Sequence, residues 1–201
     1  MRVSIFPLSG ALLYPGLALP LHIFEPRYCA MVSDALARDR RIGMIQPLRM
    51  EEHAPLYSVG TLGHISDVEA LDNGRFNIVL KGEARFRILR EMEVTTPFRQ
   101  VEAELLREPE PDEISAVERA LFEREARDFA DHQGYAVDWD QVIRLDDQAL
   151  INGVAQIAPF DPAAKQALLE CDGLRARCDM LVQMMQFYGR NEGDDGRATL
   201  Q

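Results

Sequence analysis

The stretch PLHIFEPRY, residues 20–28, decides how the first part of the chain folds. Leu21 and Ile23 alternate with His22, as expected of a strand with one buried face and one wet face. Pro26 suits the first turn of a helix, where a missing amide hydrogen costs nothing. The stretch therefore predicts a strand that passes directly into a helix, with a structural joint formed by His22, Glu25, Pro26 and Arg27.

The polar residues of this joint admit a second interpretation, because the same residue types also occur at the rim of an active site. A carboxylate at position 25 can accept the unpaired amide hydrogens at a helix start and favours the positive end of the helix dipole. Arg27 can pair with a nearby acid. We favour the structural interpretation, because it gives each polar residue a role without requiring a reaction.

Short alternating runs dominate the chain on both sides of this joint, from Arg2 to about Leu106, and predict strands. Asn73-Gly74 is typical of a tight hairpin turn in which both residues take positive φ, between strands that end near Leu71 and begin at Arg75. One helix interrupts the strands. Its apolar spacing of three and four residues predicts a buried stripe of Tyr28, Met31, Val32, Ala35 and Leu36.

The acidic, proline-containing segment LREPEPDEIS, residues 106–115, ends the strand pattern, and helical patterns follow it. The last of these helices carries an apolar stripe of Leu174, Cys178, Leu181, Val182, Met185 and Tyr188. We therefore predict an α+β protein with a β-barrel domain containing one helix over 1–108, a helical bundle over 109–189 and a disordered tail over 190–201.

The net charge of −11 argues against binding to nucleic acid or anionic membranes, which rests on Lys and Arg. The four histidines and three cysteines lack the spacing of a metal site, and no phosphate-binding glycine loop occurs, so we expect neither a metal nor a cofactor. Lys81 and Lys165 are expected to face solvent. No stretch has the length of a membrane span, and we expect a cytoplasmic protein with reduced thiols.

Four segments resemble the N-terminal substrate-binding domain of Lon proteases. They are FPLSGALLYPGLALPLHIFEPRYCAMVSDAL (6–36), GTLGHI (60–65), DNGRFNIVLKGEARFRI (72–88) and AQIAPFDPAAKQALLE (155–170). The resemblance implies a PUA-like β-barrel followed by a helical bundle that engages unfolded or tagged polypeptide. The ATPase and peptidase motifs of complete Lon proteases have no matching position, so the resemblance implies a stand-alone, non-enzymatic protein of the Lon-domain type.

From this resemblance we expect a polypeptide-binding module that recognises unfolded or apolar segments as a substrate-binding or adaptor protein in protein quality control, with a protease or chaperone ATPase as a further partner. Long loops with large apolar residues often carry binding, which makes candidates of Leu12, Leu13, Tyr14, Met50, Leu56 and Tyr57. About equally, we expect these residues simply to pack the two units together.

Two other functions stay open at this point. RNA binding through the barrel predicts a coherent basic patch of Arg75, Arg85, Arg87 and Arg90. An enzyme predicts a deep pocket that joins His22 or His64 to a buried carboxylate. The sequence contains no pattern that indicates an oligomeric state.

Overall fold

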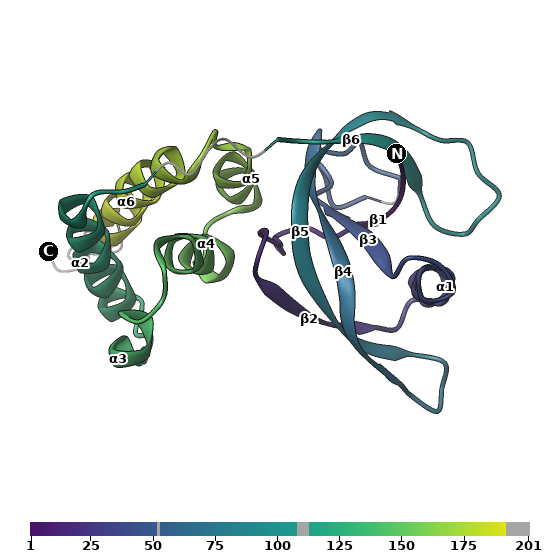
Figure 1. Cartoon of the computed structure of the whole chain (residues 1–201), viewed down its shortest axis with the longest axis horizontal. Coiled ribbons are helices and arrows are strands. Elements are labelled where there is room, and N and C mark those ends of the chain that lie inside the picture. Colours follow the sequence, from purple (N-terminus) through teal and green to yellow (C-terminus); the bar gives the residue numbers. More distant parts are fainter. Residues whose placement is uncertain (52, 108–112, 192–201) are drawn as a thin grey trace, which may run out of the picture. The chain divides into compact units, whose positions relative to one another are not determined.

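Six strands in the first part of the chain form one mixed sheet in the computed structural model (Figure 1). The structure describes residues 1–51, 53–107 and 113–191. The strand order is β2-β5-β4-β3-β1-β6, and an additional pairing joins β5 to β6 and closes a ring. The strands are β1 (Arg2–Pro7), β2 (Ala18–Ile23), β3 (Arg41–Ile45), β4 (Val59–Ala70), β5 (Phe76–Glu91) and β6 (Gln100–Leu105).

The 16-residue strand β5 makes this closure possible because it serves two sets of neighbours. Its first part pairs with both β2 and β4, whereas its last part, from Phe86 to Glu91, pairs with β6. Irregularities in register interrupt the β5 pairings, one of them between Ile88 and Arg90, and such bulges bend a strand. Phe86, fully buried on β5, packs in an apolar cluster with Ile5 and Val101 inside the ring.

The hairpin between β4 and β5 has the predicted position but a different turn. Gly74 takes a positive φ of 75°, whereas Asn73 does not share it. The Leu71 amide donates to the Arg75 carbonyl, and the Gly74 amide donates to the Leu71 carbonyl. This is the pattern of a three-residue loop that ends in a left-handed glycine, so only one residue of the pair needs the positive φ.

The helix α1 (Pro26–Leu36) follows β2 and contacts β1 and β3. The predicted stripe packs into the larger core cluster of the barrel, where Tyr28, Met31, Val32 and Ala35 are buried and Leu36 is partly buried. The Tyr28 ring lies 4.4 Å from the Phe6 ring of β1, measured between centroids. The helix thus supplies core side chains to the barrel.

The helices of the second part are α2 (Ala116–His132), α3 (Trp139–Val142), α4 (Asp147–Ile157), α5 (Pro162–Glu170) and α6 (Leu174–Asn191). The chain divides into two compact units. The barrel unit contains residues 1–107 and 159–170 of the described chain, and the helical unit contains 113–158 and 171–191. Within the helical unit α2 and α4 both pack on α6, where Cys178, Leu181 and Met185 of the predicted stripe are buried.

The α+β class is confirmed, but α5 differs from the predicted single bundle over 109–189, because this helix belongs to the barrel unit. The Gln166 side chain donates to the Val59 carbonyl at 3.0 Å and accepts from the Gln46 amide at 3.1 Å. Arg85 donates to the Leu169 carbonyl at 2.8 Å. The predicted boundary at 108/109 and residues 192–201 of the predicted disordered tail lie outside the described residues.

Lys165 corrects a further expectation, since its side chain is buried and not solvent-facing. Its ammonium group donates to the Gly10 carbonyl at 3.2 Å, and burial lowers the pKa of this lysine. Lys81 is exposed on β5. The buried lysine is therefore part of the attachment of α5 to the barrel.

Candidate functional site

The three candidate residues of the first loop are not available on the surface. Leu12, Leu13 and Tyr14 are 3%, 1% and 0% exposed. Backbone hydrogen bonds from the Gly16 amide to the Gly82 carbonyl and from the Gly82 amide to the Leu17 carbonyl bind this segment to β5. The segment is therefore held against β5 by backbone hydrogen bonds. Because their side chains are buried, these three residues are not direct contacts for a polypeptide.

The other three candidates lie in the segment between β3 and β4, and they differ in exposure. Met50 is 85% exposed. Leu56 is partly buried against the core cluster of Ile5 and Phe86, and the half-buried Tyr57 donates its amide to the Gln46 carbonyl. Only Met50 thus offers a freely exposed apolar side chain.

The polar side chains of the strand-to-helix joint all have hydrogen-bond or ion-pair partners. His22 lies 2.7 Å from the Asn77 side chain, measured from Nδ1 to Oδ1. Glu25 is the N-cap residue of α1 and Pro26 begins the helix, but the Glu25 carboxylate makes no capping bond. Instead it accepts from Arg27, whose guanidinium carbon lies 4.7 Å from the centre of the Tyr28 ring. The expected capping role of the carboxylate is therefore corrected to an ion pair.

The joint also borders a cleft of about 610 Å³ in the barrel unit. Glu25 and Arg27 line it on one side, and Met50, His53 and Arg99 line it on another. Arg99 makes a bidentate pair with Glu91 at 2.6 and 2.7 Å, which lowers the pKa of that carboxyl. The contacts of these residues thus agree with the structural interpretation of the opening stretch, and the joint also forms part of a cleft wall.

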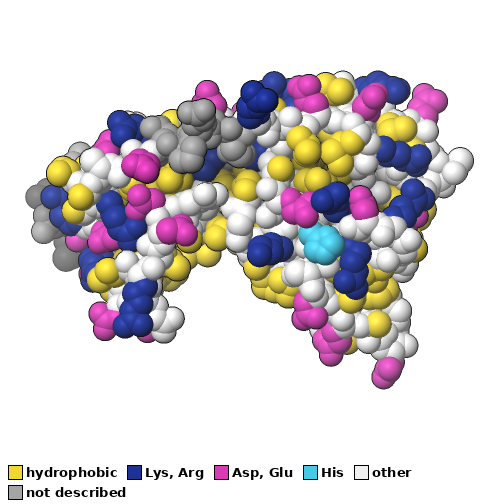
Figure 2. Space-filling view, in the orientation of Figure 1, with side chains coloured by type: hydrophobic (Ala, Val, Ile, Leu, Met, Phe, Trp, Pro, Cys, Tyr) yellow, Lys and Arg dark blue, Asp and Glu magenta, His cyan; other side chains and the backbone are white. Residues whose placement is uncertain are grey.

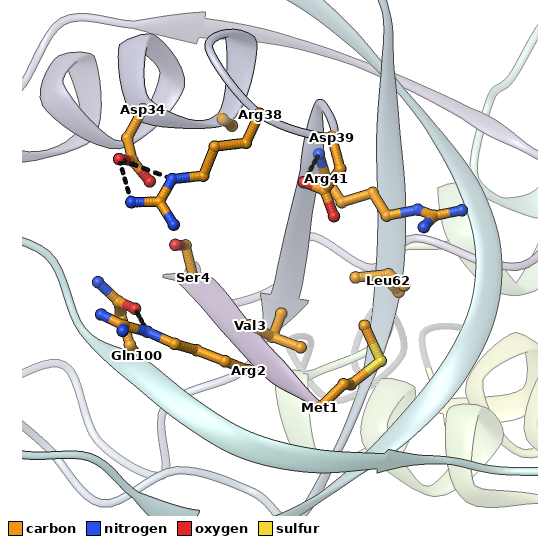
Figure 3. Close-up of a pocket in the computed structure, with 11 residues that line it drawn as sticks. Met1, Arg2, Val3, Ser4, Asp34, Arg38, Asp39, Arg41, Leu62 and Gln100 are labelled. Carbon is orange, nitrogen blue, oxygen red and sulfur yellow. Dashed lines mark hydrogen bonds and ion pairs between the residues drawn. The ribbon is translucent and has the colours of Figure 1, made fainter.

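A second pocket of the barrel unit, of about 390 Å³, lies between β1 and α1 (Figure 3). Arg38 pairs with Asp34 on α1, and Arg2 donates to Gln100. Arg41 also lines this pocket, but its guanidinium pairs with Glu83 at 2.7 Å, which raises the pKa of the arginine. The cationic groups of this pocket already have partners, so it offers no obvious ligand chemistry.

The helical unit contains a hollow of different character, about 400 Å³ in volume and lined entirely by apolar and aromatic residues. We call it the aromatic groove. Its twelve lining residues come from α2, α3, α4, α6 and the turn after α2. They are Ala126, Phe129, Ala130, Tyr135, Ala136, Val137, Trp139, Val142, Val154, Ile157, Ala158 and Met185.

Local sequence signals position the aromatic rings of this groove. Gly134, with a φ of 70°, ends α2 in a left-handed turn, and the Tyr135 amide then donates back to the Ala130 carbonyl at 2.9 Å. This is the Schellman pattern, which brings the residue after the glycine onto the last turn of the helix. Asp138 caps α3 by accepting from the Gln141 amide, which makes Trp139 the first residue of that helix.

The groove combines a buried floor with an exposed rim. Phe129 and Met185 are 6% and 2% exposed, whereas Tyr135 and Ile157 at the rim are 49% and 76% exposed. The Arg127 guanidinium carbon lies 4.6 Å from the centre of the Trp139 ring, a cation–π contact. Figure 2 shows hydrophobic side chains at the surface of the helical unit near α3 and α4. The groove therefore has a buried floor and aromatic walls that suit an apolar side chain from a partner.

The basic patch expected of an RNA-binding barrel is not assembled. Arg85 is 4% exposed and bonds to the backbone of α5, and Arg90 pairs with Glu102 at 2.7 Å. Arg75 and Arg87 are exposed. The four arginines therefore do not share one free surface.

In the described ranges 1–51, 53–107 and 113–191, no cluster of three His, Cys, Asp or Glu side chains is placed to hold a metal ion. His22 is exposed and bonds to an amide, not to a buried carboxylate. No helix in the same ranges has the length and hydropathy needed to cross a membrane.

Sequence reasoning missed the aromatic groove, although one signal was present. The segment FADHQGYAVDWDQV, residues 129–142, supplies seven of the twelve lining residues and contains the only tryptophan of the chain. Tyr135 lies in the turn after α2 and Trp139 begins α3, and residues of connecting segments often carry binding. Their relation to Val154, Ile157 and Met185 is visible only in three dimensions.

Comparisons with known proteins agree on one family. The family model described as the ATP-dependent protease La (LON) substrate-binding domain matches residues 2–186. Lon protease from Flavobacterium johnsoniae is 24% identical over 192 residues, which cover 88% of this chain and 23% of that protein. Lon protease from Methylocella silvestris is 29% identical over 201 residues, with 90% and 23% covered. The chain thus spans less than a quarter of the length of either curated relative.

Two solved structures share the fold. The Lon N-terminal domain protein from Xanthomonas campestris superposes with a TM-score of 0.69 at 21% identity, covering 91% of this chain and 98% of that chain. The N-terminal domain of Mycobacterium avium complex Lon protease gives a TM-score of 0.67, also at 21% identity, with 92% and 98% covered. At this level of identity the likeness concerns the fold.

Proposed function

Because the chain belongs to the ATP-dependent protease La (LON) substrate-binding domain family, we propose that it binds unfolded polypeptide segments and that the aromatic groove receives their apolar side chains. One observation carries the choice of site. Of the hollows described above, the aromatic groove alone has only apolar and aromatic residues around it. Unfolded chains differ from folded ones chiefly in the apolar side chains that they expose.

The energetics of the groove suit reversible client binding. Burying one Leu or Phe side chain contributes about 1.5–3 kcal/mol, and ordering an unfolded segment costs part of that gain. A groove with room for one or two such side chains therefore supports weak, releasable binding. Such binding suits an adaptor, and we propose that the protein passes its clients to a protease or chaperone ATPase.

The single tryptophan gives a direct test, because Trp139 lines the groove. We would titrate the protein with a permanently unfolded, carboxymethylated polypeptide that lacks tryptophan and record Trp139 emission. We expect a saturable shift to shorter wavelength as the bound chain excludes water from the ring. An RNA oligonucleotide of similar size is expected to leave the emission unchanged.

A matched pair of variants separates the groove from general apolar surface. Ile157→Ser removes a rim side chain that is 76% exposed, and Val117→Ser removes one that is 79% exposed on α2 and does not line the groove. Losing the burial of one such side chain weakens binding about 10- to 150-fold. We expect this loss for Ile157→Ser alone. A polypeptide that causes no saturable change, or that loses affinity equally in both variants, would contradict the proposal.

A further inference from the structure

We propose that Arg119 of α2 is a positioning residue for client binding, because it holds in place the segment that forms one wall of the aromatic groove. This inference rests on the proposed function, since it concerns how the same site is kept ready for a client. We call residues 135–145 the wall segment. Five of the twelve lining residues belong to it, namely Tyr135, Ala136, Val137, Trp139 and Val142.

The wall segment has no side chain in the core of the helical unit. None of residues 135–145 is buried, and this includes the whole of α3. The floor of the groove differs in this respect, because Phe129 of α2 and Met185 of α6 are buried. Segments with few buried apolar contacts open most readily. The position of the wall segment therefore depends strongly on its polar contacts.

Arg119 makes these contacts at the connection between α3 and α4. Its Nη2 atom donates to the Ile143 and Leu145 carbonyls at 3.1 and 2.9 Å, directly after the end of α3. Its Nη1 atom donates to the Asp147 carboxylate at 2.5 Å, and Asp147 is the first residue of α4. Its Nε atom donates to Glu123 of α2 at 2.8 Å. All three nitrogen atoms of the guanidinium group are thus engaged, and the side chain is only 23% exposed.

A guanidinium group suits this arrangement better than an ammonium group does. Its donors point in three directions from one rigid plane, whereas an ammonium group is a point charge on a single atom. Arginine side chains also satisfy the carbonyls at helix ends that have no partner within the helix. The bond with Asp147 raises the pKa of Arg119, so the group stays charged.

A second arginine of α2 contacts the other end of α3. The Arg127 guanidinium carbon lies 4.6 Å from the centre of the ring of Trp139, the first residue of α3. An exposed cation–π contact shifts an equilibrium about 2- to 5-fold. Arg119 makes four hydrogen bonds and is the stronger contact. The connection from α3 to α4 runs back alongside α2, which brings the wall segment within reach of both arginines (Figure 1).

The loss of Arg119 should let the wall segment open more often. One hydrogen bond shifts an equilibrium about 2- to 12-fold, so the loss of the two bonds to carbonyls should make opening about 5- to 150-fold more frequent. A client that needs the wall in place binds only the fraction of molecules in which the wall is closed. Its affinity should therefore fall by up to the same factor.

Hydrogen exchange of two matched variants of the full chain tests the first step. Arg119→Gln and Arg124→Gln each remove one positive charge from α2, but Arg124 is exposed, pairs with Glu125 and does not line the groove. We expect amides of residues 139–145 to exchange faster by the stated factor in Arg119→Gln alone, while amides of α6 keep their rates. A saturating amount of a peptide with a Leu and Phe core should restore the protection. An arginine with a purely structural role would lower the protection of α6 as well.

The affinity for the same peptide tests the second step. It is measured by the fluorescence anisotropy of a dye on the peptide, which does not depend on the state of Trp139. We expect Arg119→Gln to bind more weakly than the native chain and Arg124→Gln to bind equally well. Arg119→Lys keeps a charge beside Glu123 and Asp147 and serves as a second variant if Arg119→Gln does not fold. Because an ammonium group cannot reach all four acceptors, this variant should show the same two effects to a smaller extent.

The possible outcomes separate the inference from the function on which it rests. If the native chain does not bind the peptide, the proposed function fails and the inference falls with it. If the native chain binds and both Arg119 variants keep its affinity, the proposed function stands and the inference is overturned. An equal loss of affinity in Arg124→Gln, or faster exchange throughout α6 in Arg119→Gln, would also overturn it, because the effect would then follow from charge or from general destabilisation.

Discussion

Gln166 is the residue whose replacement most directly tests how α5 is held to the barrel. Its side chain is 2% exposed and bonds to the Val59 carbonyl and the Gln46 amide, which is 120 residues away in sequence. Gln166→Met keeps the length of the side chain and removes its polar atoms. The Val59 carbonyl and one hydrogen of the Gln46 side-chain amide are then buried without the hydrogen bond that Gln166 supplied.

Each buried polar group left unpaired costs about 1–3 kcal/mol. Gln46 keeps its bond to the Pro162 carbonyl, so its loss is taken at the lower end, about 1 kcal/mol. Together with about 1–3 kcal/mol for the Val59 carbonyl, the expected total is about 2–4 kcal/mol. This cost weakens the attachment of α5, and the change also removes the bond from the Gln166 side chain to the Glu170 carboxylate within the helix. Local opening should therefore become about 30- to 900-fold more frequent, at about 1.4 kcal/mol for each factor of ten.

Hydrogen exchange followed by mass spectrometry measures this opening directly. Amides of residues 163–170 should exchange faster by that factor in Gln166→Met, while amides of α2 keep their rates. The control is Ala163→Gln, a change at an exposed position of the same helix. Unchanged protection of α5 in Gln166→Met, or an equal loss in the control, would refute the reasoning.

Four further predictions concern single residues. A Cβ at Gly82 would lie 2.1 Å from the Tyr14 carbonyl oxygen, so Gly82→Ala should lower the free energy of unfolding by about 1–3 kcal/mol in urea titrations followed by circular dichroism. Gly153→Ala in α4, where a Cβ meets nothing within 4 Å, should raise it by about 0.5–1 kcal/mol. The pKa of Glu91 is lowered in the folded protein by its hydrogen bond with Arg99, so this stabilisation is present above the ordinary carboxylate pKa and lost as the pH falls through the folded value. Glu91→Gln should accordingly lower stability by less than about 1 kcal/mol at pH 7, with the difference from the native chain shrinking below about pH 4 in the same titrations. Burial raises the pKa of the Cys178 thiol to about 11, so peptide mapping should show iodoacetamide at pH 8 labelling the half-buried Cys29 well before Cys178.

Local features were predictable because their causes lie within a few residues. The ring of Pro26 favours a helix start, and Gly74 favours the turn because glycine takes a positive φ without strain. The buried stripe of α1 follows from the spacing of three and four residues between its apolar positions, because residues at that spacing lie on one face of a helix. The strand-rich first part and the helical second part follow from the same kind of local pattern.

Features that depend on contacts distant in sequence were not predictable. The sequence around Gln166 indicates a helix, but nothing in it shows that this helix pairs with Gln46 and Val59 and so belongs to the barrel unit. Leu12 to Tyr14 read as an exposed apolar loop, because the hydrogen bonds that attach their segment to Gly82 come from a strand about 70 residues later.

The aromatic groove illustrates the same limit for function. Its lining residues lie on four helices and one turn, and most of them also fit the apolar stripe of an ordinary bundle helix. The difference between a core stripe and a groove is whether another element covers the side chains. That difference is set by how α2, α3, α4 and α6 pack within the helical unit.

The most direct test of the central claim is to locate a bound polypeptide on the protein. A peptide with a Leu and Phe core, one Leu of which is replaced by a diazirine photo-leucine, would be bound to the full chain, irradiated and mapped by mass spectrometry. We expect cross-links within residues 126–142 and 154–158, which an excess of the unlabelled peptide abolishes. Cross-links confined to the barrel cleft, at residues 25–28, 47–51 and Arg99, would contradict the proposed site.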